Sequence, residues 1–210
     1  MTVLPLVRRR PASVRISLPH GGTAQLRPLG DGESTPLLEV FAAMSSESRA
    51  SRYLTAMPRL PDSFVRTLSA TDGLVHVGWL ASVDGRPAGI GRYVRMSEDP
   101  CTVDLAFEVV DAQQRRGLGA ALLDTITTVA ADHGVRRLRA TALPENRASL
   151  RLLSRLGIPM SFDDGVMEGS APLRLLDPPR IDRRAVLELS RLSAPAPAEP
   201  VWTVPCAAAH

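Results

Sequence analysis

The sequence predicts one mixed α/β domain, with a largely antiparallel central sheet and helices on both of its faces. Asp84-Gly85 and Asp163-Asp164-Gly165 each lie between extended stretches, and such turns favour hairpins of antiparallel strands. Between the two hairpins, an expected strand at 103–110 is followed by a long helix and a second strand at 137–143. A strand, helix and strand in succession among hairpin-linked strands imply a mixed sheet covered on both faces.

The chain before residue 70 is expected to form one hairpin and three short helices. A His-Gly-Gly turn separates the two strands of the hairpin, and apolar residues in the first helix recur at helical spacing. A serine can cap the second helix, and a Pro-Asp pair is typical of a helix start. The expected elements are strands at 13–19 and 23–29 and helices at 35–44, from Ser45 or Ser46 to Tyr53, and from Pro61-Asp62 onward.

The rest of the domain alternates strands with two helices. In the long helix, apolar residues recur at the spacing of one helix face and Gly134 can serve as the C-cap. The later helix begins at an asparagine and ends at Gly157. The expected elements are strands at 75–83, 87–96, 103–110 and 137–143, helices at 117–133 and 146–156, and a last hairpin of 158–162 and 166–173.

The ends of the chain differ in composition from its middle. We expect an N-terminal arm at 1–12, the folded domain at 13–176 and a Pro-rich tail at 177–210 with one short helix at 183–191. Arg8, Arg9 and Arg10 follow the first apolar residues, whereas a secretory signal has its charges first. The protein is therefore expected in the cytoplasm.

Composition excludes several classes of partner. All 25 basic residues are arginine, and the net charge of +3 with a pI near 9.5 suits an anionic ligand. The arginines are dispersed and only 4% of residues are aromatic, which argues against nucleic acid. No apolar run approaches the roughly 18 residues of a membrane span. Neither of the two cysteines has a His or Cys at metal-ligand spacing, so no metal site is expected.

The segment that joins the strand 103–110 to the long helix carries the clearest binding signal. Gly117 and Gly119 allow a ligand to approach the backbone, and Arg115 and Arg116 add positive charge at a helix N-terminus. Such a site suits a pyrophosphate. By itself the segment could also be a structural turn. It lacks the three-glycine dinucleotide fingerprint, and it lacks the lysine of a P-loop.

Two segments resemble those of a known family. Gln114-Arg115-Arg116-Gly117-Leu118-Gly119 matches the Gln/Arg-x-x-Gly-x-Gly/Ala signature of GNAT acetyltransferases. About 30 residues later, the stretch 143–157 resembles the family's Asn-opened helix that ends in Leu-Gly. The resemblance implies a GNAT fold, in which the strands 103–110 and 137–143 splay apart around acetyl-CoA.

Further stretches are similar to the catalytic domains of bacterial protein lysine acetyltransferases that modify acyl-CoA synthetases. They are Arg27-Pro28-Leu29, 46–49 with Arg52, 58–60 and 91–95. The resemblance implies direct transfer of an acetyl group from acetyl-CoA to an amine, with a protein lysine as the favoured acceptor. A small amine as acceptor and a non-catalytic acyl-CoA sensor are the alternatives. The oligomeric state and the acyl preference are left open.

The resemblance also implies which residues contact the acyl donor. Backbone groups would pair with the pantetheine arm, amides of the helix start would hold the pyrophosphate, and the later helix would contact the CoA arm. The residues are Val109, Val110, Gln114, Arg115, Arg116, Gly117, Leu118, Gly119, Ala120, Asn146 and Ser149.

Two carboxylates are candidates for the catalytic base. Asp104 and Glu108 point to the same face of their strand, beside the expected thioester. Partial burial there would raise a carboxyl pKa. In the similar enzymes a Glu fills the position of Asp104, and each candidate could instead pair with Arg92 or Arg139. Many GNAT enzymes protonate the leaving thiolate with a Tyr, but Leu153 stands at that position.

Overall fold

The computed structural model describes residues 12–19 and 21–193, and within them it confirms the mixed sheet. The strand order is β1-β2-β3-β4-β5-β6-β8-β7, and every neighbouring pair is antiparallel except β5 and β6. The strands are β1 (Val14–Ser17), β2 (Thr23–Pro28), β3 (His76–Val83), β4 (Arg86–Arg95), β5 (Thr102–Val109), β6 (Arg137–Ala142), β7 (Ser161–Asp163) and β8 (Val166–Pro172).

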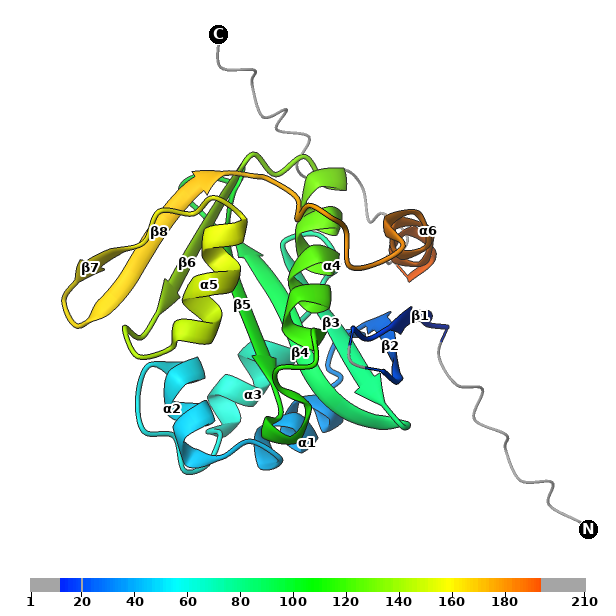
Figure 1. The fold of residues 1–210 in the computed structure, drawn as a ribbon, viewed down its shortest axis with the longest axis horizontal. Helices are drawn as coiled ribbons and strands as arrows, with labels where there is room; N and C mark the ends of the chain where they lie inside the picture. The colour runs from blue at the N-terminus through cyan, green and yellow to red at the C-terminus, as the bar shows by residue number, and fades with distance from the viewer. Residues whose placement is uncertain (1–11, 20, 194–210) are drawn as a thin grey trace, which may run out of the picture.

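Helices cover both faces of this sheet. On one side lie α4, α5 and α6, and on the other lie α1, α2 and α3 (Figure 1). Their bounds are α1 (Thr35–Ala42), α2 (Ser46–Tyr53), α3 (Asp62–Ser69), α4 (Leu118–Asp132), α5 (Arg147–Arg155) and α6 (Arg183–Ser193). A short 3₁₀ turn, η1 (Asp111–Gln113), precedes α4 and was not predicted. The strand expected from residue 158 begins only at Ser161.

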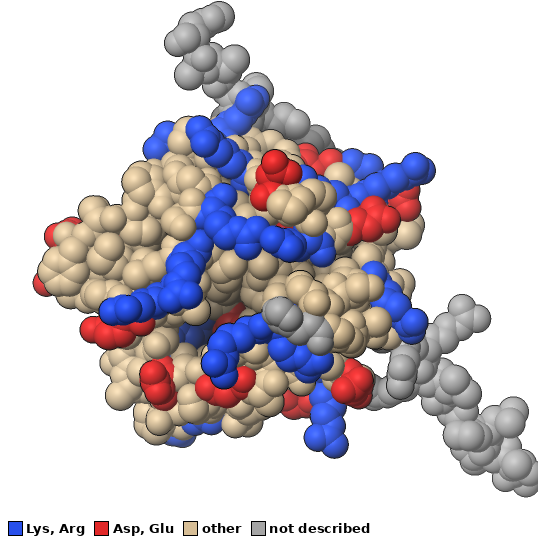
Figure 2. Space-filling model, in the orientation of Figure 1, with Lys and Arg blue, Asp and Glu red and all other residues tan. Residues whose placement is uncertain are grey.

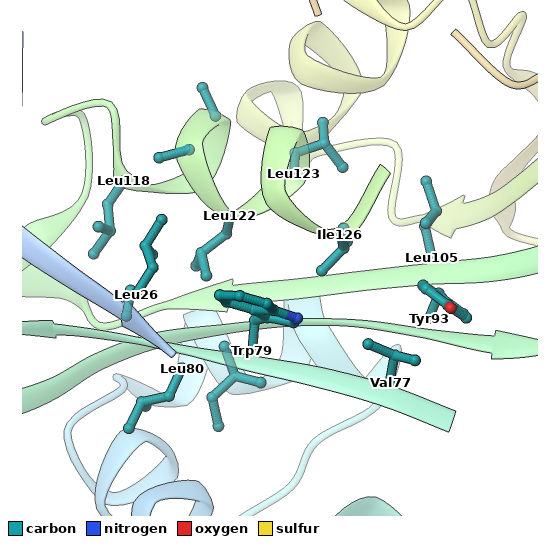
Figure 3. Packing of buried hydrophobic residues seen from close by; sticks show 14 of the residues in the cluster. Leu26, Val77, Trp79, Leu80, Tyr93, Leu105, Leu118, Leu122, Leu123 and Ile126 are labelled. Atoms are coloured by element: carbon teal, nitrogen blue, oxygen red, sulfur yellow. The ribbon is translucent and has the colours of Figure 1, made fainter. Parts of the chain in front are cut away.

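The core lies mainly between α4 and the middle of the sheet. Leu118, Leu122 and Ile126 point from α4 toward Trp79 of β3, and all four side chains are buried (Figure 3). Gly91 of β4 lets the helix come close, because a Cβ there would lie 3.1 Å from Ile126 Cγ2. The apolar spacing in the sequence therefore determines which face of α4 packs on the sheet. Gly91 of β4 determines how closely the helix approaches the sheet.

The sheet splays between its two parallel strands, as predicted. Pairing of β5 with β6 runs from Thr102 opposite Arg137 to Leu105 opposite Ala140 and then ends. Beyond that point β5 stays paired with β4 as far as Val109, and β6 stays paired with β8. One edge of β5, at 106–109, is consequently left without a β-strand partner and opens the sheet.

Past residue 176 the chain returns to the body of the molecule. The predicted short helix exists as α6, and its Val186 and Leu189 are buried. Arg183 donates two hydrogen bonds to Asp124, a fully buried carboxylate of α4. The division into arm, domain and tail remains a prediction; the arm up to residue 11 and the Pro-rich stretch 195–200 lie outside the described residues.

The described residues contain no candidate membrane span and no candidate metal site. None of the helices there has the length and apolar character to cross a membrane. In the same part of the chain, no three His, Cys, Asp or Glu side chains gather as a metal site.

Candidate active site

The segment from β5 to α4 is shaped by two residues with positive φ. Arg115 has φ 59°, and Gly117, the N-cap of α4, has φ 91°. No side chain caps α4, so the first backbone amides of this helix have no side-chain partner. A Cβ on Gly117 would lie 2.7 Å from Pro19 Cδ, and therefore only glycine fits. This combination of free amides and a positive helix end suits an anion.

The basic residues of this segment have different surroundings. Arg115 is exposed. Arg116 is half-buried, and it donates hydrogen bonds to Gln113 Oε1 and to the carbonyl of Gly21 in the β1–β2 turn. Arg116 thus braces the neighbouring turn as well as adding charge. Leu118 and Ala120 were also predicted to contact the ligand. Their side chains are buried, so these two residues can contact it only through their backbone amides.

Helix α2 is tied to the same segment. Asp111 accepts hydrogen bonds from the amide and hydroxyl of Ser45 (2.7 and 2.9 Å) and from the hydroxyl of Ser48 (2.7 Å). Gln114 Nε2 donates to Ser48 Oγ at 3.1 Å and to the Val109 carbonyl at 3.2 Å. Sequence reasoning missed Asp111 and its two serines, because their positions are more than 60 residues apart in the chain.

Val109 and Val110, both predicted to pair with a pantetheine arm, differ in the structure. The Val110 amide donates to the Ala88 carbonyl, and its carbonyl accepts from the Gln113 amide, each at 2.9 Å. Val109 lies at the unpaired edge of β5, and its carbonyl accepts a hydrogen bond from the Gln114 side chain. Val109 is therefore the better placed of the two to bind an extended ligand.

The second predicted segment forms α5, which lies beside α4. Asn146 caps the helix, with its Oδ1 accepting from the Ser149 amide at 3.1 Å. Leu152 lies close to the helix start, since a Cβ on Gly119 would be 3.3 Å from its Cδ1. Leu153 is 2% exposed and belongs to the core. An aliphatic side chain thus occupies the place where the resemblance implied a proton donor.

Asp104 is an exposed carboxylate on β5, at the level where the sheet begins to open. Among the described residues, its side chain takes part in no hydrogen bond or ion pair. Although the Asp104 side chain keeps solvent-exposed surface, the protein around its carboxyl desolvates it in part and raises the pKa of Asp104 above its usual value, and the positive charges of Arg139 and Arg52 oppose that rise. An unpaired carboxylate with a raised pKa can accept a proton from a nearby amine.

Glu108, the other candidate base, is held between two arginines. It is 4% exposed, its Oε2 accepts from Arg52 Nε of α2, and its Oε1 lies 3.5 Å from Arg92 Nη2 of β4. Arg92 was one of the partners considered from the sequence. Arg52 was not, because it lies 56 positions before Glu108 and no local pattern links them. A carboxylate paired in this way is suited to fixing α2 against the sheet.

The raised pKa of Asp104 leads to a prediction on pH. A base acts only when deprotonated, so activity should fall as the pH drops through the pKa of Asp104. Arg139 lowers that pKa, and Arg139→Gln should therefore move the acid limb of the kcat profile to higher pH. Arg137→Gln, on the same strand, is the control and should leave the limb in place. If the acid limb stays in place in both variants, the titration behind it belongs to a group other than Asp104.

A sheet splayed at a parallel strand pair, with an uncapped helix start and a carboxylate on the same strand as the opening, is the arrangement expected of an α/β transferase with an anionic ligand. Comparisons with known proteins agree with this class. The model of the acetyltransferase (GNAT) family matches residues 39–158. The chain therefore belongs to the GNAT acetyltransferase family.

Individual relatives are similar over much of this chain. The GNAT domain of S. lividans PAT is 31% identical, with a TM-score of 0.71 over 79% of this chain and all of that domain. The acetyltransferase Pat of Mycolicibacterium smegmatis is 29% identical over 63% of this chain and 40% of its own length, so the chain spans well under half of that relative. A putative acetyltransferase from Salmonella typhimurium, solved with its cofactor acetyl-CoA, shares the fold at 18% identity and a TM-score of 0.57, covering 74% and 97% of the two chains.

Proposed function

We propose that this protein transfers the acetyl group of acetyl-CoA directly to the side-chain amine of a protein lysine. The observation that carries the proposal is Asp104, an unpaired carboxylate beside the splayed edge of β5. The resemblance of stretches such as 46–49 and 91–95 to bacterial protein lysine acetyltransferases supports a protein as the acceptor, and the 31% identity to the GNAT domain of S. lividans PAT is consistent with it.

The residues at the opening fit the acyl donor. Free amides at the start of α4, with Arg115 beside them, suit a pyrophosphate, and the unpaired edge at Val109 suits the amide groups of a pantetheine arm. Four further residues remain proposed contacts of acetyl-CoA, namely Gln114, Arg116, Asn146 and Ser149. In the structure they form hydrogen bonds that fix the conformation of the surrounding backbone. Acetyl-CoA supplies the electrophilic thioester carbonyl.

The chain's own residues then need to do two things. They hold the amine and the thioester in contact, which contributes much of the rate in a two-substrate reaction. Asp104, directly or through a water, accepts the proton that the amine loses as its nitrogen bonds to the acetyl carbon and the C–S bond breaks. No enzyme side chain forms a bond to the acetyl group. With Leu153 buried, the thiolate leaves without a proton from α5.

The alternatives make different demands on the same site. A small-amine enzyme needs an enclosed acidic pocket for its acceptor, whereas Asp104 is exposed and its companion Glu108 is neutralised by arginines. An acyl-CoA sensor needs the cofactor site but no base. The exposure of Asp104 favours an acceptor that approaches from outside, as a protein does.

Incubation with acetyl-CoA and a panel of lysine peptides and small amines tests the proposal. CoA release and acceptor mass are measured together. We expect one added acetyl group on a peptide lysine. Turnover only on small amines would contradict a protein acceptor, and acetyl-CoA binding without any turnover would favour the sensor. The cytoplasmic location stays a prediction from the sequence.

A further inference from the structure

The outer side of α5 carries a line of arginines. Arg147, Arg151 and Arg155 are spaced four residues apart, so they lie on one side of the helix, and all three are exposed. Arg174 extends the line, because its Nη1 lies 3.5 Å from where a Cβ on Gly157 would be. We call these four residues the basic face. Figure 2 shows a band of basic side chains over this region of the molecule.

The basic face has no acidic partner within residues 12–19 and 21–193. None of its four side chains makes an ion pair or a side-chain hydrogen bond with another described residue. Some exposed arginines elsewhere do find partners. Arg184 pairs with Glu188 at 2.9 Å, and Arg191 pairs with Asp132 at 2.6 Å. Others, such as Arg15, have none among the described residues, so the basic face is distinguished by the clustering of its unpaired arginines along one helix.

The arrangement also works against the stability of α5. Arginines four residues apart repel each other, and Arg147 stands at the first position of the helix, where the dipole is positive. The first turn of α5 contains no acidic residue, whereas α2 and α3 have Glu47 and Asp62 there. An external anion would relieve this repulsion.

The basic face begins near the proposed site of acetyl transfer. Helix α5 follows directly on β6, whose Arg139 lies opposite Asp104 of β5. Figure 2 shows the surface hollowed between the regions of α5 and α2, with charged atoms at its floor. A partner that lies over this recess can contact α5 at the same time.

We propose that the basic face binds an acidic stretch of the acceptor protein, close in sequence or space to the lysine that is acetylated. This inference rests on the proposed function and specifies its acceptor. The CoA phosphates are a weaker match, because the uncapped helix start that suits a pyrophosphate belongs to α4, and the residue of α5 that lies near Gly119 there is the aliphatic Leu152. Nucleic acid is also a weaker match, because no aromatic residue accompanies the arginines on α5.

Peptide binding tests the inference without requiring turnover. Two fluorescent peptides share one central lysine, flanked either by Asp and Glu or by Ser, and their anisotropy is measured at low salt. The double variant Arg147→Glu/Arg151→Glu should bind the acidic peptide about tenfold more weakly and the Ser peptide unchanged, since charge contacts of this kind are each modest and screened. Added salt should remove the preference of the native protein for the acidic peptide.

The control carries the same change of charge elsewhere. Arg15→Glu/Arg86→Glu alters two exposed arginines of β1 and β4, and its binding of the acidic peptide should match that of the native protein. Equal loss in both double variants would reduce the effect to net charge and overturn the inference. Loss of acetyl-CoA affinity in the α5 variant alone would also overturn the inference. The same holds if duplex DNA displaces the acidic peptide from the native protein but not from that variant.

The same measurements separate the two proposals. Binding of the acidic peptide that depends on Arg147 and Arg151, but without acetylation of its lysine, would contradict the proposed function and keep the docking face. Acetylation of both peptides with equal KM in the native protein would support the function and overturn the docking face.

Discussion

Asp104→Asn is expected to lower kcat/KM for acetyl transfer by about 10²- to 10³-fold, the usual contribution of a general base. Asparagine keeps the size and polarity of the side chain but cannot accept the proton of the attacking amine. The affinity for acetyl-CoA and the unfolding midpoint should stay close to native values, because the Asp104 side chain has no hydrogen-bond partner to lose among the described residues.

Glu108→Ala is the matched comparison, since both carboxylates belong to β5. Its removal leaves Arg92, whose side chain is 3% exposed, without its acidic partner. Loss of one member of a buried ion pair costs about 3 kcal/mol, so this variant should unfold at clearly lower urea concentration. If Asp104→Asn keeps its activity while a stable Glu108→Gln loses it, the two roles must be exchanged.

Arg183→Ala is expected to lower the free energy of unfolding by about 3 kcal/mol, because it leaves the buried carboxylate of Asp124 without its positively charged partner. Asp124 has no exposed side-chain surface, and its Oδ1 accepts from Arg183 Nε at 3.0 Å and Nη2 at 2.6 Å. Among the described residues, the Arg180 amide, at 2.6 Å, would then be the one hydrogen-bond donor left to this carboxylate. Urea unfolding with an unchanged m-value would measure the loss.

The next residue in the chain provides the control. Arg184 also forms an ion pair, with Glu188, but the pair lies on the surface of α6. Arg184→Ala should leave the urea midpoint unchanged, because exposed pairs add little. Similar midpoints for the two variants would show that α6 is not an integral part of the fold, and they would favour the predicted boundary at residue 176.

The fold was largely predictable because its signals are local. Hairpin turns such as Asp84-Gly85 and the apolar spacing of Leu118, Leu122 and Ile126 depend only on backbone geometry and on periods of two or 3.6 residues. The binding segment at Gly117 was visible for the same reason, since a glycine followed by a helix is a short-range pattern. What was missed at this level was small, namely η1 and the late start of β7.

The sequence by itself determined the strand and helix order and the presence of two carboxylates on one strand, and its resemblance to the GNAT family implied the splay between β5 and β6. Only the tertiary structure decided how those carboxylates differ. Arg52 reaches Glu108 from α2 and leaves Asp104 unpaired, and Asp124 joins α6 to α4. Ion pairs between residues more than 50 positions apart form only when packing brings the elements together, and no periodicity along the chain encodes them.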